Sequence, residues 1–158
     1  MDHPPEWQVS QWLNSERPLG LAELRGRVVL LHAFQMLCPG CVLHGLPQTQ
    51  RVARLLAGTP LTVVGLHTVF EHHAVMGPAA LAVFLAEHGY DFPVGIDAPG
   101  PAGDPLPRTM RAYQLEGTPS TLLFDARGRL RYRHFGVEED LRLGAQLGLL
   151  LQEAETQG

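Results

Sequence analysis

Cys38 and Cys41 are the only two cysteines in the chain, and they stand three positions apart. A thiolate is the reactive form of cysteine, and a helix N-terminus lowers a thiol pKa to roughly 3.5–7.5. The pair follows a continuous apolar run at 28–34, which is typical of a strand buried on both faces, and Pro39 suits the first turn of a helix. This placement predicts a redox pair in which Cys38 attacks a disulfide from the helix start. Cys41, one turn further in and shielded, would resolve the mixed disulfide.

Two other interpretations of the cysteines are weaker. They could be buried structural thiols, since free cysteine packs as a small apolar side chain. They could also bind zinc together with His44, in the spacing Cys-x-x-Cys-x-x-His. Residues six apart on a helix differ in direction by about 240°, so these three ligands would converge poorly, and His72 and His73 would have to complete the site from elsewhere. We therefore expect no metal site.

The elements that would position the pair alternate between strands and helices. We expect a strand at 28–34, a helix from Cys38 or Pro39 to Leu56 with a kink at Pro47, a strand at 61–67, a helix at 78–88, a strand at 92–97, a short helix at 108–115, a hairpin of strands 121–124 and 130–135, and a helix at 138–155. Such an order predicts a mixed sheet with helices on both faces.

The length and composition predict one soluble globular domain over 1–158, with an N-terminal arm at 1–20 anchored by Trp7 and Trp12 and a core at 21–156. The chain has 158 residues, of which 45% are hydrophobic and 18% charged, and its formal net charge is −4. No basic excess could neutralise phosphates, which argues against nucleic-acid binding. The absence of a membrane-length apolar run and of a signal-like N-terminal segment predicts a cytoplasmic protein that does not contact membranes.

Several segments together resemble one family. They are Leu24-x-Gly26-x-Val28-Val29-Leu30-Leu31, Cys38-Pro39-Gly40-Cys41, Phe92-Pro93-x-x-x-Asp97, Gly117-Thr118-Pro119-Ser120-Thr121 and Asp125-x-x-Gly128-x-Leu130. In this combination, which covers about 19–155, the chain resembles the thioredoxin-fold superfamily. Within it, the chain is most similar to the TlpA/ResA-like and redoxin (AhpC/TSA-related) group.

The resemblance implies a three-layer α/β fold with a mixed central sheet flanked by helices, an N-terminal extension and an insertion after the second strand, at 65–73. It implies a thiol-disulfide oxidoreductase with no cofactor beyond the redox-active disulfide Cys38–Cys41. The substrate would be a protein or low-molecular-weight thiol or disulfide, and the sequence does not identify the reducing partner. Pro119 would be a cis-proline facing the disulfide, with Thr118 before it pairing with an incoming peptide.

Three positions around the pair depart from thioredoxin itself. Leu37 replaces the tryptophan before the first cysteine, Pro39-Gly40 replaces Gly-Pro between the cysteines, and His32 replaces a buried aspartate. The intervening dipeptide tunes thiol pKa and potential, so the redox poise does not carry over. His32 has two interpretations, a proton acceptor for Cys41 or a core histidine hydrogen-bonded to the backbone.

Further along the chain, His67, His72 and His73 are candidates for the rim of the site, although a solvated loop is the simpler interpretation of the last two. Four arginines alternate along the predicted hairpin, which is typical of the exposed face of an edge strand, where charge deters aggregation. These arginines are Arg127, Arg129, Arg131 and Arg133.

Two further function classes remain open at this stage. A peroxiredoxin-like peroxide reductase shares the fold, but its Pro-x-x-x-Thr-x-x-Cys signature is absent, because Leu31 and Gln35 occupy those positions before Cys38. The second alternative is a thioredoxin-fold interaction domain in which the thiols are incidental. Reduction of protein disulfides, turnover of peroxide, or neither would separate the three.

Overall fold

A six-stranded mixed sheet forms the centre of the molecule. The computed structural model describes residues 1–157, so the last residue of the predicted 1–158 domain lies outside the described residues. The strands are β1 (Val9–Leu13), β2 (Val28–Phe34), β3 (Leu61–His67), β4 (Val94–Asp97), β5 (Ser120–Phe124) and β6 (Leu130–Phe135). They lie side by side in the order β1-β4-β3-β2-β5-β6. The pairs β2/β3 and β3/β4 are parallel, and the other three pairs are antiparallel.

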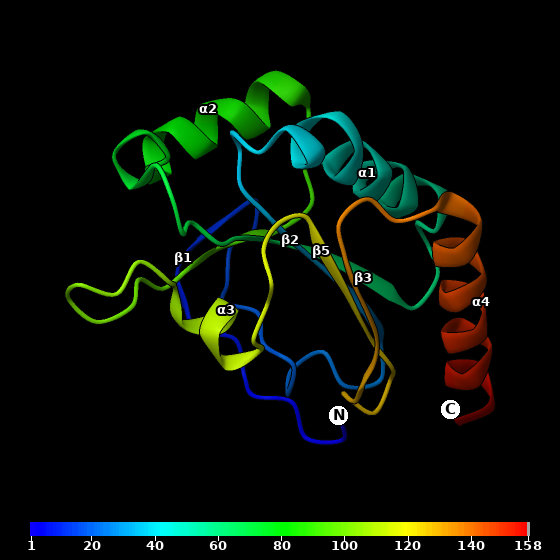
Figure 1. The fold of residues 1–158 in the computed structure, drawn as a ribbon. Helices are drawn as coiled ribbons and strands as arrows, with labels where there is room; N and C mark the ends of the chain where they lie inside the picture. Colours follow the sequence, from blue (N-terminus) through cyan, green and yellow to red (C-terminus); the bar gives the residue numbers. More distant parts are fainter. Residues whose placement is uncertain (158) are drawn as a thin grey trace.

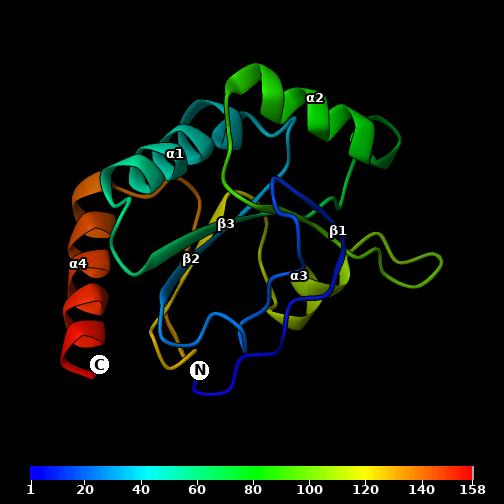
Figure 2. The same cartoon turned by 180° about the vertical axis from the view of Figure 1, so that it is seen from behind.

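The helices cover both faces of this sheet, which gives the three layers expected from the sequence (Figure 1). They are α1 (Leu46–Leu55), α2 (Pro78–His88), α3 (Arg108–Ala112) and α4 (Asp140–Gln157), with a π-helical turn at Cys41–Gly45 and a 3₁₀ turn at His73–Val75. Side chains of α1, α2 and α4 share one apolar cluster, and α3 shares the other with the N-terminal segment. Seen from behind, α3 again lies apart from α1, α2 and α4 (Figure 2).

Strand β2 holds the two layers together because both of its faces are buried. Val28, Leu30 and Phe34 pack on the side of α1 and α4, whereas Val29 and Leu31 pack on the side of α3. This alternation is the two-residue period of a strand applied to a sequence that is apolar throughout. Because β2 is paired with β3 on one side and with β5 on the other, it is an inner strand, and its carboxyl end lies between those of neighbouring strands and away from the outer strands of the sheet. The residues that follow β2 are thereby held by the most buried strand of the fold.

Helix α2 runs over the same residues as the sequence predicts. Pro78 stands in its first turn and Gly89 ends it with a positive φ of 69°, a conformation that glycine adopts without strain. Strand β1 differs from the sequence prediction, which gives the N-terminal arm at 1–20 no strand. Trp7 is indeed buried against Phe124, but the following residues add an edge strand to the sheet.

Arg131 and Arg133 lie on the edge strand β6, as predicted, whereas Arg127 and Arg129 lie in the turn before it. Arg131 also holds the strand to α4. The buried Asp125 accepts from Arg129 Nε at 2.8 Å and from Arg131 Nη1 at 3.2 Å, and Arg131 also pairs with Glu153 of α4. The hairpin is therefore fixed in place by a buried carboxylate. Within residues 1–157 no helix is long and apolar enough to cross a membrane.

Candidate functional site

The two cysteines lie where the chain leaves β2 and enters its first helical turns. A turn closes this junction, because the Cys38 N–H donates to the Gln35 carbonyl at 3.0 Å, and helical bonding begins with Val42 N–H donating to the Cys38 carbonyl. Cys41 is fully buried and Cys38 is partly exposed. The two thiols are 3.2 Å apart and not bonded to each other. The placement of Cys38 at the start and Cys41 one turn in agrees with the sequence analysis.

The helix over the site is widened where the sequence predicted a kink. Leu46 N–H donates to the Cys41 carbonyl, five residues back, which makes 41–45 a π-helical turn. Pro47 follows directly, and its ring has no N–H and crowds the carbonyl four residues earlier. A wider turn relieves this crowding without ending the helix. The predicted kink therefore takes the form of a π turn, and Gly45 in this turn lies against Pro119 and His32.

The Thr118–Pro119 loop packs against the underside of these turns. The peptide bond is cis, as the resemblance implied, and the Cys38 thiol donates to the Thr118 carbonyl at 3.5 Å. A Cβ at Gly40 would lie 3.2 Å from Pro119 Cδ, and one at Gly45 would lie 3.1 Å from Pro119 Cβ. A side chain at either helix position facing the proline would crowd the proline ring, and both positions are glycines.

The two thiols have opposite electrostatic environments. Burial raises the pKa of the Cys38 thiol, but hydrogen bonds from Cys41, Thr118 and Gly40 outweigh it, so the pKa lies below its ordinary value. Burial raises the pKa of the Cys41 thiol to about 12. At neutral pH Cys41 therefore keeps its proton, and Cys38 is the thiol that ionises more readily.

His32 lies directly beneath the π turn. Its Nδ1 is 3.2 Å from Thr121 Oγ1, and its Nε2 would be only 2.7 Å from a Cβ at Gly45. Nε2 has no hydrogen-bond partner among the described residues. Burial lowers the pKa of His32 to about 4, so the imidazole is neutral at pH 7.

His67 at the end of β3 supports the loop before Cys38. Its Nε2 accepts the Met36 N–H at 3.2 Å, which requires the neutral imidazole with its proton on Nδ1. Burial lowers the pKa of His67 to about 4. Of the three histidines considered for the rim, His67 thus contacts the site loop, whereas His72 and His73 are exposed.

Gln35 is a residue of this site that the sequence analysis did not select. It is 1% exposed, and its carboxamide contacts the backbone of Phe70 and the side chains of Glu71 and Thr118. The sequence signal that could have identified Gln35 is a glutamine three residues before the candidate nucleophile. Its partners, however, are more than 30 positions away in the sequence.

Apolar side chains are exposed in the segments next to Cys38. Leu37 is 51% exposed beside it, and Leu43 is 67% exposed in the π turn. Phe135, the last residue of β6, is 49% exposed, and Val137, just after the strand, is 55% exposed. Gly136, between them, donates its N–H to the Pro119 carbonyl at 2.7 Å, which places this segment against the cis-proline. Pro39, between the cysteines, is also exposed.

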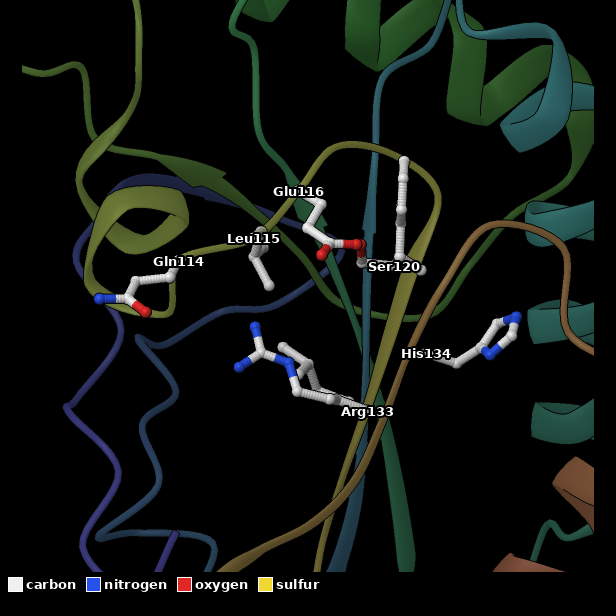
Figure 3. Close-up of a pocket in the computed structure, with 8 residues that line it drawn as sticks. Gln114, Leu115, Glu116, Ser120, Arg133 and His134 are labelled. Atoms are coloured by element: carbon white, nitrogen blue, oxygen red, sulfur yellow. The ribbon is translucent and has the colours of Figure 1, made fainter.

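A separate cavity of about 380 Å³ opens on the side of α3. Glu116, from the loop that leads to Thr118, and Arg133, from β6, extend into it (Figure 3). Neither cysteine lines this cavity, so it adjoins the cis-proline loop without containing the redox pair. Elsewhere within residues 1–157, no three histidine, cysteine or acidic side chains gather in a way that could hold a metal ion.

The chain is similar to proteins of known redox class. A solved thioredoxin-like superfamily protein is 53% identical, with 93% of this chain and 94% of that chain aligned and a TM-score of 0.90. A thiol-disulfide isomerase from Corynebacterium glutamicum is 48% identical over 96% of this chain and 98% of its own, with a TM-score of 0.89. The DipZ protein of Mycobacterium tuberculosis is 28% identical over 81% of this chain, which spans 17% of that relative's length. No protein-family model matches the chain.

Replacing Gly45 by alanine tests the close packing over the redox pair. Alanine normally stabilises a helix interior by roughly 0.5–1 kcal/mol relative to glycine. Here the new methyl would meet His32 at 2.7 Å, so we expect Gly45→Ala to lower the free energy of unfolding by about 1–3 kcal/mol. Gly144→Ala in the exposed part of α4, where nothing lies within 4 Å, is the matched control and should be stabilising. Urea unfolding measures the free energy of unfolding of both variants. An equal change in Gly45→Ala and Gly144→Ala would show that Gly45 is not packed closely against His32.

The two buried imidazoles make stability depend on pH. In the unfolded chain each has a pKa near 6.5, and in the folded protein about 4. Between these values the unfolded state binds more protons, so stability is complete above pH 6.5 and falls as the pH decreases toward 4. We expect His32 and His67 each to account for roughly 1–2 kcal/mol of the loss between pH 7 and pH 5.

Urea unfolding at both pH values checks this dependence. His67→Gln, which keeps an acceptor for Met36, should reduce the loss, and His72→Gln at an exposed position should not. An unchanged loss in His67→Gln would show that this imidazole is not held neutral by burial.

Proposed function

Because the chain belongs to the thioredoxin-like superfamily, we propose that it is a thiol-disulfide oxidoreductase in which Cys38 attacks and Cys41 resolves. The observation that carries this proposal is the pairing of two thiols 3.2 Å apart in opposite environments. One thiol is accessible with a lowered pKa, and the other is buried with a raised pKa. Disulfide exchange by such a pair needs one sulfur that is ionised and accessible to the substrate. The other sulfur acts later, when it attacks the mixed disulfide.

In the first step the Cys38 thiolate attacks one sulfur of a substrate disulfide. A bond forms between Cys38 Sγ and that sulfur, and the substrate's other sulfur leaves as a thiolate and takes a proton from water. The hydrogen bonds that lower the pKa of Cys38 raise its thiolate fraction at neutral pH. The partial exposure of Cys38 gives the substrate access.

In the second step Cys41 releases the substrate. Burial is the largest cause of the raised pKa of Cys41, and the negative charge of the Cys38 thiolate adds to it. Once Cys38 is in a mixed disulfide, that charge is gone and Cys41 ionises more readily. Its thiolate attacks Cys38 Sγ, the second substrate sulfur leaves and is protonated, and two electrons have passed from the pair to the substrate.

A direct proton transfer from Cys41 to His32 is opposed by their pKa values. The thiol holds its proton with a pKa of about 12, and the imidazole accepts one with a pKa of about 4. We therefore favour the second interpretation of His32, a core histidine that fills the space between Gly45 and Thr121. The hypothesis that it accepts the Cys41 proton stays a prediction.

We propose a protein disulfide, in preference to a small thiol, as the substrate. A cluster of exposed apolar side chains near the nucleophile favours contact with an apolar peptide segment. Leu37 supplies that surface beside Cys38, and Leu43 and Val137, which line one pocket next to the π turn, extend it. Thr118 would pair with the peptide backbone while Pro119 faces the redox pair, and Pro39 and Gly40 complete the surface around Cys38. An incoming peptide would replace the contact that the Cys38 thiol makes with the Thr118 carbonyl.

The direction of electron flow depends on the compartment. A cytoplasmic location stays a prediction of the sequence analysis. In that compartment the reduced pair would donate electrons to substrates and would need a reducing partner. The equilibrium reduction potential of the pair relative to glutathione distinguishes a donor from an acceptor.

Trapping with Cys41→Ser tests the assigned roles. Serine has a similar shape but cannot exchange disulfides, so the mixed disulfide on Cys38 should persist for minutes instead of resolving. Cys38→Ser should trap little, because the remaining thiol is buried. Wild-type protein should reduce insulin disulfides, and both variants should lose that activity. Non-reducing electrophoresis and mass spectrometry of adducts with insulin measure the outcome.

The same variants separate the alternatives. A peroxiredoxin-like enzyme would keep its first turnover of peroxide in Cys41→Ser and form a sulfenic acid on Cys38. An interaction domain would form neither adduct nor oxidised cysteine. Equal trapping by Cys38→Ser and Cys41→Ser would show that the attacking and resolving roles are wrongly assigned.

A further inference from the structure

The buried carboxamide of Gln35 connects the redox pair to the segment that follows β3. Its Oε1 accepts the Phe70 N–H at 3.2 Å. Its Nε2 donates to Thr118 Oγ1 at 3.4 Å and to Glu71 Oε1 at 3.5 Å. One side chain thus joins three segments that are far apart in the sequence, and it lies three residues before Cys38.

These contacts fix the direction in which the carboxamide faces. The Phe70 N–H can only donate, so it selects the carbonyl oxygen of Gln35. The Glu71 carboxylate can only accept when ionised, so it selects the amide nitrogen. Both partners agree on one orientation, and this orientation presents an N–H to the Thr118 hydroxyl.

The Thr118 hydroxyl is therefore used as an acceptor by Gln35 and has its own proton left to donate. Thr118 lies against the redox pair, because its backbone carbonyl accepts from the Cys38 thiol at 3.5 Å. The Thr118 side chain is one of the groups that lower the pKa of Cys38, and at Cys41 it partly offsets the larger rise that burial causes. A donor that is itself hydrogen-bonded is polarised and donates more strongly.

We propose that Gln35 is a positioning residue whose carboxamide turns the Thr118 hydroxyl proton toward the cysteine sulfurs and so stabilises the Cys38 thiolate. The proposal rests on the proposed function, because it assigns a means of activating the same nucleophile. Gln35 acts through Thr118 and does not itself touch the substrate.

The charged and titratable groups around Gln35 allow this assignment. Glu71, on the segment after β3, faces Nε2 of Gln35, and its charge holds the carboxamide in place. His67 at the end of β3 and His32 in β2 are both neutral at pH 7 because burial lowers their pKa to about 4. Cys41 keeps its proton in the same range because burial raises its pKa to about 12. None of these three groups changes charge where Cys38 titrates.

The experiment measures the alkylation rate of Cys38 against pH in the full-length reduced protein with iodoacetamide. Gln35→Leu removes both hydrogen-bonding arms, and we expect a profile displaced to higher pH, with a rate at pH 6 lower by roughly three- to tenfold. Gln35→Glu keeps the shape but accepts the Thr118 proton instead of directing it at sulfur, so its displacement should be at least as large. Gln48→Leu is the matched control. Gln48 is also buried, at 7% exposed in α1, but donates to the Glu138 carbonyl and to Asp140.

A double substitution shows whether Gln35 acts through Thr118. In a Thr118→Val background the hydroxyl is gone, so adding Gln35→Leu should change the profile no further. Circular dichroism confirms that each variant is folded. The proposal is overturned if folded Gln35→Leu and Gln35→Glu both keep the wild-type profile, or if the displacement is undiminished in the Thr118→Val background. A wild-type Cys38 that titrates like free cysteine would instead contradict the proposed function itself.

Discussion

The contact between the first helical turns and the Thr118–Pro119 loop is the constraint on which the site depends. It places the Thr118 carbonyl against Cys38 Sγ and buries Cys41 beneath the same turns. The absence of side chains at Gly40 and Gly45 allows this close approach to Pro119. The opposite environments of the two thiols follow from this packing, since the same turns leave one sulfur at the surface and cover the other.

The framework behind this contact is the central position of β2. Its apolar side chains lie in both core clusters, so the chain cannot shift at the point where it leaves the sheet. Two hydrogen bonds then hold the segment just before Cys38. The Met36 N–H donates to His67 at the end of β3, and the Gln35 side chain accepts from the Phe70 N–H. These hydrogen bonds position the residues that lead into Cys38, and a reactive group must be held in place by its neighbours in this way.

Much of the fold and the reacting residues could be predicted because their signals are local. The apolar run of β2, the proline start and glycine end of α2, and the cysteine spacing are each readable within about ten residues. Strand β1 could not be predicted, because its sequence has no strong alternation and only its pairing with β4 makes it a strand. The roles of Gln35 and His67 were also hidden, since their partners come from segments more than 30 positions away. The π turn could be predicted only in part. Pro47 indicates that the helix is distorted, but it does not indicate that the distortion is a π turn.

The central claim is that the two thiols differ in protonation and access, and residue-resolved alkylation tests it most directly. Reduced wild-type protein is treated with iodoacetamide between pH 5 and 10, and the peptides containing Cys38 and Cys41 are quantified separately by mass spectrometry. The account predicts that Cys38 is labelled with a midpoint below the value of about 8.5 for a free thiol, while Cys41 stays unlabelled in the folded protein. Equal labelling of both cysteines, or earlier labelling of Cys41, would contradict it.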